Sequence, residues 1–481
     1  MSRFALATLF LLACNTSDSV RTAAVGGTTT TTPPPVNSTG HDWPQFNYDA
    51  ARSGVSPDPT GLTAANIPTM QRQQVQIDGT VDASAIYLHN VTVNGAAHDV
   101  FFITTTYGKT LAIDANDGSI LWRFTPSSFS QLSGSARITN VTPVADPGRT
   151  AIYSASPDGN VVKLAVADGH LLWTTSITSL PQREKIASPL SYSSGHVIAT
   201  TGGFIGDAPS YQGHVSVLDA STGQLLHTWN SLCSNRAGLI DPNSCAQSGS
   251  AIWGRAGAVI DASGNILVAT GNGLWDGATS WGDAIVQLDP LASQMLANYT
   301  PSITATLESN DADLGSVSPA ILDATHVVQA GKDGLLRVVD LSTLTGTTAH
   351  KGGEVQSVRT PSGGAMFTAL AVYKQGGSSY VFAADGGATA AWTYSGGRLT
   401  AAWSNSRAGT SPVIAGGLLF VYDPGGTLRV YDPTSGNAVA SLACGGGHWN
   451  SPIVADGRIA LPEGNANAHS GSGVLNIWRL P

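Results

Sequence analysis

Short stretches of alternating apolar and polar residues recur along the chain and indicate β-strands. Each stretch begins near a glycine, runs into an aspartate, passes through a polar turn with another glycine, and returns as a second apolar run that ends near a tryptophan. Alternation with a period of two is typical of strands with one buried face. Aspartate and glycine favour the tight turn between such strands. Each copy of the pattern therefore predicts an antiparallel hairpin.

Eight copies of this unit follow one another at intervals of roughly 50 residues, a period typical of propellers and other repeat folds. The clearest copy is GKTLAIDANDGSILWRF, and the last, GVLNIWRLP, stops after one strand. Seven hairpins begin at Gly108, Gly159, Gly213, Asp283, Gly334, Gly387 and Gly426, and the truncated eighth begins at Gly473. The interval from Gly387 to Gly426 is the shortest, which leaves seven blades as the alternative to eight.

A second signal of small residues precedes most of the hairpins. It is found at Ser84, Thr142-Pro143, Ser188-Pro189, Ser318-Pro319, Ser411-Pro412 and Ser451-Pro452. Small residues suit an innermost strand crowded around a central axis, so each unit should hold four strands. We predict an all-β fold, a single eight-bladed β-propeller of four-stranded antiparallel blades over residues 41–481. The segment Met70–Ile77 would complete the eighth blade and close the ring, which removes an open edge.

Composition agrees with this fold and restricts the partners. Hydrophobic residues make up 42% of the chain and charged residues only 11%, and the 55 glycines suit many short strands joined by tight turns. The net charge is −9, and no run rich in lysine or arginine occurs. We therefore expect no nucleic acid partner.

The N-terminus has the features of an export signal. Arg3 precedes an apolar stretch, Phe4–Ala13, that is too short to span a bilayer. It ends in Leu-Leu-Ala-Cys14, which resembles the lipobox of bacterial lipoproteins and implies cleavage before Cys14 and a lipid on its sulfur. We expect a signal peptide at 1–13, a Thr/Pro-rich tether at 14–40, and an exported lipoprotein held to a membrane by this lipid, in the periplasm or at the cell surface. An ordinary signal peptide with an incidental cysteine is the alternative.

The remaining cysteines suggest one disulfide. Export places the chain in an oxidising compartment, and Cys233 and Cys245 bracket a single polar loop, so we expect them to be bonded to each other. Cys444 would then be left over, buried and inert. No Cys-x-x-Cys pair occurs, which argues against a zinc ribbon and a conventional c-type haem site.

The repeat resembles that of pyrroloquinoline quinone (PQQ) enzymes. Ala112–Trp122 matches the repeat closely and Leu218–Trp229 matches it partly, and the segment His41–Pro57 resembles the start of many quinoprotein-like propellers. The resemblance implies the fold but two different functions. Quinoprotein alcohol dehydrogenases bind PQQ and Ca²⁺ at the ring centre. The lipoprotein B subunit of the outer-membrane β-barrel assembly machinery has no cofactor and works through protein contacts.

The resemblance to the dehydrogenases extends to four candidate site residues. It implies that Asn272, in Thr-Gly-Asn, gives an oxygen to Ca²⁺, that Trp253 stacks beneath the quinone, that Asp313 is the catalytic base and a further metal ligand, and that Lys332 contacts the quinone. Each residue also has a structural interpretation. Asn272 would be a turn residue, Trp253 a packed channel residue, Asp313 an Asx-type turn and Lys332 a solvated hairpin lysine.

Two departures from the dehydrogenases stand against that site. The position of their glutamate ligand to Ca²⁺ is Ala208 here, and only the neighbouring Asp207 could replace it. Their adjacent cysteine pair is also absent from the segment GSARITNVTPV.

From these observations we expect a lipid-anchored, monomeric propeller that acts as a binding or protein-interaction scaffold without catalysis or cofactor. Envelope proteins or a small ligand would bind at one propeller face. The alternative is a dehydrogenase of alcohols or sugars that depends on PQQ and calcium and has a modified site. Motifs for zinc proteases, nucleotide-binding loops and serine hydrolases do not occur.

Overall fold

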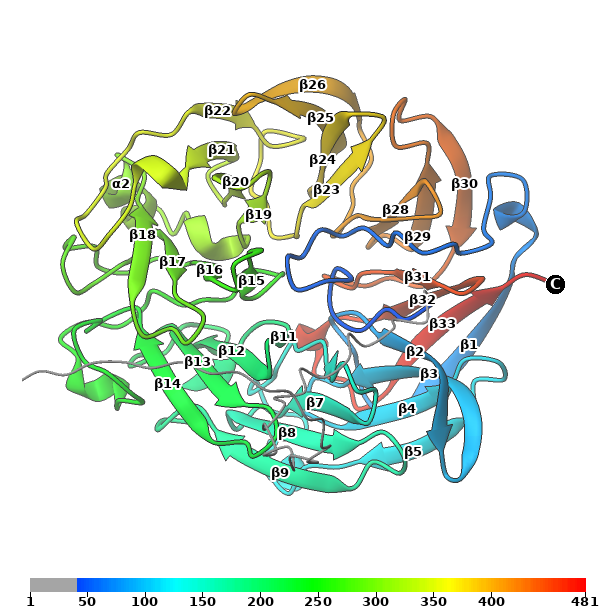
Figure 1. Cartoon of the computed structure of the whole chain (residues 1–481). Coiled ribbons are helices and arrows are strands. Elements are labelled where there is room, and N and C mark those ends of the chain that lie inside the picture. Colours follow the sequence, from blue (N-terminus) through cyan, green and yellow to red (C-terminus); the bar gives the residue numbers. More distant parts are fainter. Residues whose placement is uncertain (1–40) are drawn as a thin grey trace, which may run out of the picture. The chain divides into compact units, whose positions relative to one another are not determined.

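The computed structural model describes residues 41–481, which form a closed ring of eight β-sheets (Figure 1). The predicted signal peptide, the tether and Cys14 lie outside the described residues. Eight sheets confirm the eight-bladed propeller and exclude the seven-bladed alternative. None of the helices in residues 41–481 could cross a bilayer, and the longest of them, α2, has six residues.

The blades follow one another along the chain, and each runs from its inner strand to its outer strand. Their strands are, for blade 1, β2 (Ile86–Val93), β3 (Ala96–Thr104), β4 (Thr110–Asp114) and β5 (Ile120–Phe124); for blade 2, β6 (Val144–Ala145), β7 (Ala151–Ala155), β8 (Asn160–Ala165) and β9 (Leu171–Ser176); for blade 3, β10 (Glu184–Ile186), β11 (Ser191–Ser193), β12 (His196–Gly203), β13 (His214–Asp219) and β14 (Leu225–Asn230); and for blade 4, β15 (Val259–Ile260), β16 (Ile266–Ala269), β17 (Ile285–Leu288) and β18 (Met295–Tyr299).

The second half of the ring repeats this order. Its strands are, for blade 5, β19 (Ala320–Ile321), β20 (His326–Ala330), β21 (Leu335–Asp340) and β22 (Gln356–Arg359); for blade 6, β23 (Ala371–Gln375), β24 (Ser378–Ala384), β25 (Thr389–Ser395) and β26 (Arg398–Asn405); for blade 7, β27 (Val413–Ala415), β28 (Leu418–Asp423), β29 (Thr427–Tyr431) and β30 (Ala438–Ala443); and for blade 8, β31 (Ile453–Ala455), β32 (Arg458–Glu463), β33 (Gly473–Arg479) and β1 (Gln71–Ile77). The helical turns are η1 (Ile67–Thr69), α1 (Phe129–Leu132), η2 (Pro242–Ser244), α2 (Thr304–Ser309), η3 (Leu314–Ser316), η4 (Leu341–Thr343) and η5 (Ala466–Ala468).

The predicted hairpins are the two outer strands of the blades. Blade 5 differs, because η4 and a longer connection separate β21 from β22 where the sequence predicted a tight turn. Blade 3 has five strands, since both β10 and β11 pair with β12. The small-residue signals lie just before the inner strands, as Ser411-Pro412 does before β27.

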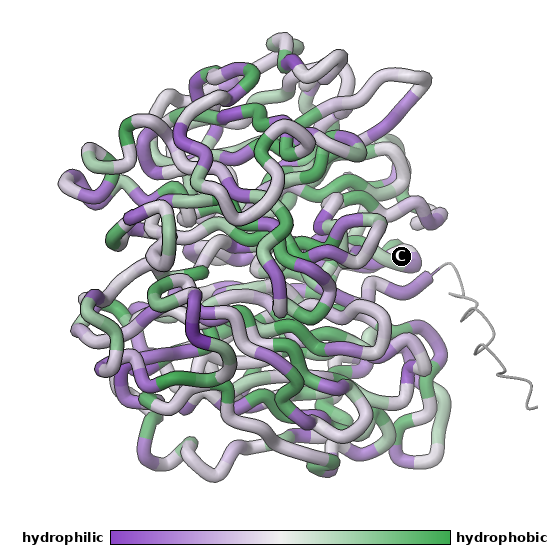
Figure 2. Tube along the Cα trace, turned by 60° about the vertical axis from the view of Figure 1, so that its left-hand side comes forward, coloured by the Kyte–Doolittle hydropathy of each residue, from purple (hydrophilic) through white to green (hydrophobic). Residues whose placement is uncertain are grey.

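The repeat sequence is explained by packing between neighbouring blades. The indole of Trp122, at the end of one hairpin, donates a hydrogen bond to Val166 O in the turn of the next blade, at 2.9 Å. A Cβ on Gly169 of that turn would stand 2.5 Å from the same ring, so only glycine fits there. Trp403 repeats the arrangement with Pro433 O and Gly436. The hairpin turns at Gly169, Gly223 and Gly436 therefore each pack against the tryptophan of the preceding blade. The hydropathy colouring shows apolar segments inside the blades and polar ones in many of the loops (Figure 2).

The N-terminal strand closes the ring, as predicted. β1 pairs antiparallel with β33, so that the first and the last strand of the described chain lie side by side (blue and red in Figure 1). Val75 and Ile77 point into the core, whereas Gln74 and Gln76 are exposed.

Shortening a core side chain in the closing strand should destabilise the whole ring. Ile77→Ala should lower the free energy of unfolding by about 2–5 kcal/mol, because it removes buried methyl groups and leaves a cavity. Gln76→Ala, on the exposed side of the same strand, should change it by less than about 0.5 kcal/mol. Urea unfolding followed by tryptophan fluorescence measures both variants, and equal effects would contradict closure by β1.

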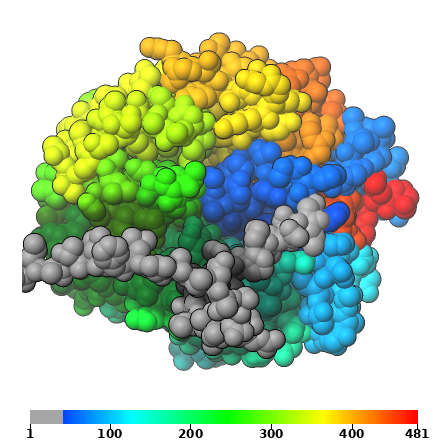
Figure 3. Space-filling model, viewed as in Figure 1, coloured from blue at the N-terminus to red at the C-terminus, as the bar shows by residue number. Residues whose placement is uncertain are grey.

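The two faces of the ring are built differently. The turns between the first and second strands of the blades form one face, here called the opposite face, and the second strands end at the other, the site face. The segment 41–57 crosses the opposite face (dark blue in Figures 1 and 3). It is tied to several blades, since Val372 N donates to Ser53 O at 2.8 Å, Ile414 N donates to Gly54 O at 2.7 Å, and the buried Arg52 guanidinium donates to Leu190 O at 2.8 Å.

Candidate functional site

The four residues singled out from the sequence meet at one cavity. Trp253, Asn272, Asp313 and Lys332 all border a hollow of about 250 Å³, and Asp207 borders it too. Asn272 and Lys332 follow the ends of β16 and β20, and Asp313 directly precedes η3, ahead of β19. The cavity therefore opens on the site face. A larger hollow, of about 1140 Å³, lies on the opposite face. It is bordered by the segment 41–57 and by the turns between the first and second strands of several blades, and none of the predicted site residues borders it.

Asp313 is the centre of the polar network. One of its carboxylate oxygens accepts a hydrogen bond from Asn272 N at 2.7 Å, and the other contacts the ammonium group of Lys332. Lys332 also reaches Asp311 at 2.9 Å and lies 5.5 Å from the centre of the Trp253 ring. Lys332 is thus a partly buried ion-pair partner, not the solvated hairpin lysine of the structural interpretation.

Burial and charge act against each other on this pair. Burial raises the pKa of Asp313, and the ammonium group of Lys332 offsets only part of that shift. Burial by itself would lower the pKa of Lys332, but the carboxylates of Asp313 and Asp311 outweigh it and hold that pKa above its usual value. Asp313 is therefore a more basic carboxylate than an exposed aspartate, which suits a proton acceptor.

Asn272 offers an oxygen that nothing in the described chain uses. Its side-chain nitrogen donates to Leu307 O at 2.9 Å and to Glu308 O at 3.3 Å, which fixes the orientation of the amide. Its Oδ1 atom is buried and has no hydrogen-bond partner in residues 41–481. A buried acceptor without a partner costs free energy unless a ligand satisfies it. The loop Thr270–Asp283, which joins β16 to β17, therefore also provides an oxygen atom that can bind a ligand.

The close packing of this network depends on Gly271. A Cβ at that position would stand 2.1 Å from Asp313 Oδ1 and 3.1 Å from Trp253 Nε1. Glycine lets the backbone approach the carboxylate and the indole at once.

The cavity has a cationic side that the sequence analysis missed. Lys185 and Arg255 border it, and both are more than nine-tenths buried. Burial lowers the pKa of Lys185 to about 8 and that of Arg255 to about 10. Within residues 41–481 the only hydrogen-bond partner of the Lys185 ammonium group is the Asn140 oxygen at 3.3 Å, so its charge is poorly compensated and suits an anionic ligand.

Aromatic rings form a second part of the wall that the sequence analysis missed. Trp449 borders the cavity together with Trp253, and their ring centres lie 6.2 Å apart. The Arg255 guanidinium lies 4.3 Å from the Trp449 ring centre, and Phe367 packs against both tryptophans. The arrangement offers flat apolar faces beside fixed positive charges.

These residues fit a planar aromatic polyanion such as PQQ. Trp253 and Trp449 supply ring faces, and Lys185, Arg255 and Lys332 supply positive charge. For Ca²⁺ the donors are fewer, namely the free oxygen of Asn272, the Asp313 carboxylate and Asp207. Asp207 lies on an exposed loop and Ala208 stands where the dehydrogenases have glutamate.

Asp283 is a buried acid next to the site, and the sequence analysis did not single it out. Asp283 Oδ1 accepts a hydrogen bond from Leu314 N at 2.9 Å, while its other oxygen is buried without a partner in the described chain. Burial raises the pKa of Asp283 to about 8, and the charges of Asp313 and Glu308 act in the same direction. Asp283 is therefore protonated at neutral pH.

Replacing Asp283 with a side chain that cannot ionise should stabilise the protein near neutral pH, because the carboxyl group ionises freely only in the unfolded chain. Because its folded pKa is about 8 and its unfolded value is 3.8, the stability of the native chain falls as the pH rises from about 4 to 8. Asp283→Asn cannot ionise and should gain on the order of a few kcal/mol over the native chain at pH 8 and little at pH 4.5. Denaturant titrations at both pH values measure this difference, and an equal effect at both would contradict it.

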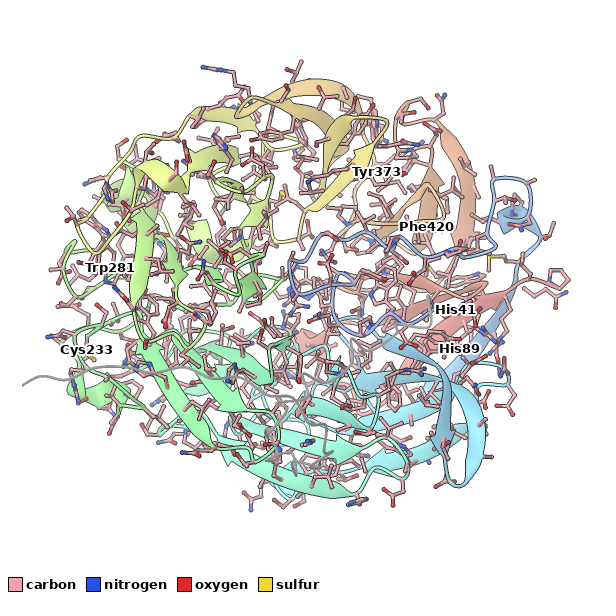
Figure 4. The ribbon with its side chains drawn as sticks, in the orientation of Figure 1. His41, His89, Cys233, Trp281, Tyr373 and Phe420 are labelled. Atoms are coloured by element: carbon pink, nitrogen blue, oxygen red, sulfur yellow. A yellow bond between two sulfur atoms is a disulfide. The ribbon has the colours of Figure 1, made fainter. Side chains whose placement is uncertain are left out.

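The predicted disulfide is present and lies on the site face. Cys233 and Cys245 are bonded, with Cα atoms 6.1 Å apart, and the loop joins β14 to β15 (Figure 4). Leu232 N donates to Gln212 Oε1 at 3.1 Å, which ties this loop to the one that carries Asp207. Cys444 is half-buried, where the sequence predicted a buried cysteine, because it directly follows Ala443 at the end of β30. Burial, together with nearby Glu463, raises the pKa of its thiol to about 12, so it stays protonated.

Comparison with known proteins finds similarity to both kinds of protein that the sequence resembles, the dehydrogenases and the outer-membrane assembly factor. Residues 72–273 match a family model described as outer membrane protein assembly factor BamB. A polyvinylalcohol dehydrogenase of Pseudomonas sp. is 24% identical over 267 residues, which are 52% of this chain and 39% of that protein. The dehydrogenase subunit of a quinone alcohol dehydrogenase from Gluconobacter oxydans is 28% identical over 141 residues, 28% of this chain and 17% of that subunit. The chain thus matches well under two thirds of the length of these relatives.

Solved structures of both kinds of protein share the fold of this chain. A quinohemoprotein alcohol dehydrogenase from Comamonas testosteroni superposes with a TM-score of 0.68 at 17% identity, covering 93% of this chain and 83% of that one. BamB from Moraxella catarrhalis superposes with a TM-score of 0.54 at 15% identity, covering 85% and 98%. The chain is therefore an eight-bladed β-propeller that is similar both to quinone alcohol dehydrogenases and to the outer membrane protein assembly factor BamB.

Proposed function

We propose that the chain binds a planar, anionic quinone of the PQQ type with a divalent cation in the cavity on the site face and oxidises an alcohol there. One observation carries the proposal. Trp253, Asn272, Asp313 and Lys332, which are far apart in sequence, border one cavity, and the Asn272 oxygen faces no partner within the described residues. The combination of an indole face, an unpartnered amide oxygen and a basic carboxylate at one cavity supports the dehydrogenase alternative.

The chain's own residues would divide the work as follows. Trp253 and Trp449 hold a flat ring system, and Lys185 and Arg255 neutralise carboxylates. Asn272 Oδ1 and Asp207 hold the cation together with Asp313. When bound, the quinone would supply the acceptor for the hydride of the alcohol carbon. Asp313 takes the hydroxyl proton, and Lys332 holds its carboxylate in place from the other side.

An activity assay tests this proposal. The full chain is incubated with PQQ and Ca²⁺, and reduction of an artificial dye is followed with primary, secondary and polymeric alcohols as well as sugars. We expect turnover with at least one alcohol, which stops when EDTA removes the cation. If the protein binds PQQ but reduces no dye with any substrate, the proposed dehydrogenase activity is contradicted, whereas cofactor binding is not.

A protein-interaction scaffold is the second candidate, supported by the match of residues 72–273 to the BamB family model. The Cys233–Cys245 loop on the site face would then be part of the contact surface, facing envelope proteins. The match to an envelope protein also supports export, and anchoring by a lipid on Cys14 remains a prediction. Mass spectrometry of the N-terminal peptide from membranes tests that anchor.

A further inference from the structure

A second group of ligand-type side chains lies far from the cavity, where the ring closes. His89 comes from β2 and Asp99 from β3 of blade 1, whereas Asp456 comes from the turn between β31 and β32 of blade 8. One candidate ligand atom from each of the three lies within 4.8 Å of the others. His41, at the start of the described chain, joins them, with its ring centre 4.7 Å from that of His89 (Figure 4).

The contacts in this group have the spacing of ligands around a single ion. His89 Nδ1 lies 2.9 Å from Asp99 Oδ1 and 3.0 Å from Asp456 Oδ2, and His41 Nδ1 lies 3.2 Å from Asp456 Oδ1. Bonds of about 2.0–2.2 Å to imidazole nitrogen and carboxylate oxygen place neighbouring ligands of a tetrahedral zinc ion roughly 3.3 Å apart. The four side chains would therefore need only small movements to bind one ion.

Hydrogen bonds alone leave part of the polar atoms of this group unsatisfied. A neutral imidazole carries one N–H, so His89 Nδ1 can donate fully to only one of the two carboxylates that it touches. His41 Nδ1 is a buried atom with no hydrogen bond in residues 41–481. A divalent cation would satisfy both nitrogens and both carboxylates at once.

Neighbouring groups hold these side chains from behind. Arg458 donates to Asp99 Oδ2 at 2.9 Å and to Asp456 Oδ2 at 3.1 Å. Asp99 Oδ1 stays directed to His89, Asp456 Oδ1 stays directed to His41, and Asp456 Oδ2 is shared between Arg458 and His89. The Tyr87 hydroxyl donates to Asp456 Oδ2 at 2.9 Å. The strand β2 also has a bulge between Leu88 and Val91, which re-aims the His89 side chain. Such outer contacts orient ligands in protein metal sites.

We propose that His41, His89, Asp99 and Asp456 form a zinc site that fastens the N-terminal segment and blade 1 to blade 8. Two imidazoles and two carboxylates suit Zn²⁺ better than the harder Ca²⁺, which prefers oxygen ligands alone. The side chains are partly exposed, at 38% for His41 and 31% for His89, so the ion can enter from solvent. This site is independent of the cavity and of the reaction proposed for it.

Calorimetric titration of the EDTA-treated full chain with Zn²⁺ tests the proposal. We expect one equivalent to bind and the melting temperature to rise with Zn²⁺ concentration. His89→Gln and Asp456→Asn should each weaken binding at least about tenfold. His170→Gln is the matched control, since His170 and Asp168 form an exposed pair at 2.6 Å on a different hairpin and should not matter.

Two further variants keep the result interpretable. His41→Gln alters only the start of the described segment and should keep the melting temperature in EDTA while weakening Zn²⁺ binding. Asn272→Ala should leave Zn²⁺ binding unchanged, because it affects only the cavity. No Zn²⁺ binding by the full chain, or binding that survives both His89→Gln and Asp456→Asn, would overturn the site.

Discussion

Asp313→Asn should abolish alcohol oxidation by the reconstituted protein while leaving it folded and able to bind PQQ. The carboxylate is the one group that both borders the cavity with raised basicity and contacts Lys332. Asparagine keeps the size and can still accept the hydrogen bond from Asn272 N, but it cannot take a proton. We expect the turnover number to fall at least about 100-fold, the usual contribution of general base catalysis.

The matched control for this variant is Asp311→Asn. Asp311 also contacts Lys332, at 2.9 Å, but its side chain is 82% exposed, so it should contribute little to proton transfer. Dye-linked assays of both variants at saturating PQQ measure the difference. Equal loss in the two variants would mean that Lys332, not Asp313, is the group that matters.

Lys185→Met should weaken PQQ binding strongly without destabilising the protein. Lys185 is buried, and a single amide oxygen is its partner in the part of the chain that the structure describes, so its charge costs free energy unless an anion lies beside it. Methionine has a similar volume and no charge. We expect the dissociation constant for PQQ to rise at least about tenfold, and the midpoint of urea unfolding to stay the same or increase.

The pH dependence of binding provides a further check on Lys185. Because its pKa in the free protein is about 8, the lysine loses its charge as the pH rises through 8, and affinity for an anion should fall there. That decline should be absent in Lys185→Met. Lys374→Met, which removes the same charge beside the hollow on the opposite face, should leave both affinity and pH profile unchanged.

The ring itself could be predicted from the sequence because its signals are local and repeated. Each hairpin carries its own turn residues, and the tryptophan that ends one hairpin packs on the glycine of the next. The truncated last unit required a partner strand, and the alternation of Val75 and Ile77 supplied one. The long connection between β21 and β22 was not predicted, because no local sequence pattern distinguishes it from the tight turns of the other hairpins.

The candidate site could be predicted only in part. Asn272 and Asp313 were found through their resemblance to a known motif. Lys185 and Trp449 lie in segments without one, and Arg255 lies two residues after Trp253 in a matching segment but was not singled out. A positional rule could have found two of them. Lys185 and Trp449 lie two or three residues before the small-residue signals at Ser188 and Ser451, the positions from which side chains reach the channel mouth. Burial and electrostatics, which single out Lys185 and Asp283, depend on the assembled ring.

Titration of the full chain with PQQ, in the presence of Ca²⁺ and after its removal with EDTA, tests the central claim most directly. Trp253 and Trp449 border the cavity, so a bound quinone should quench tryptophan fluorescence in a saturable way. We predict one site per chain, tighter binding with Ca²⁺, and loss of the Ca²⁺ effect in Asn272→Ala. Fluorescence that PQQ leaves unchanged at all concentrations, with or without Ca²⁺, would contradict the account and favour the scaffold.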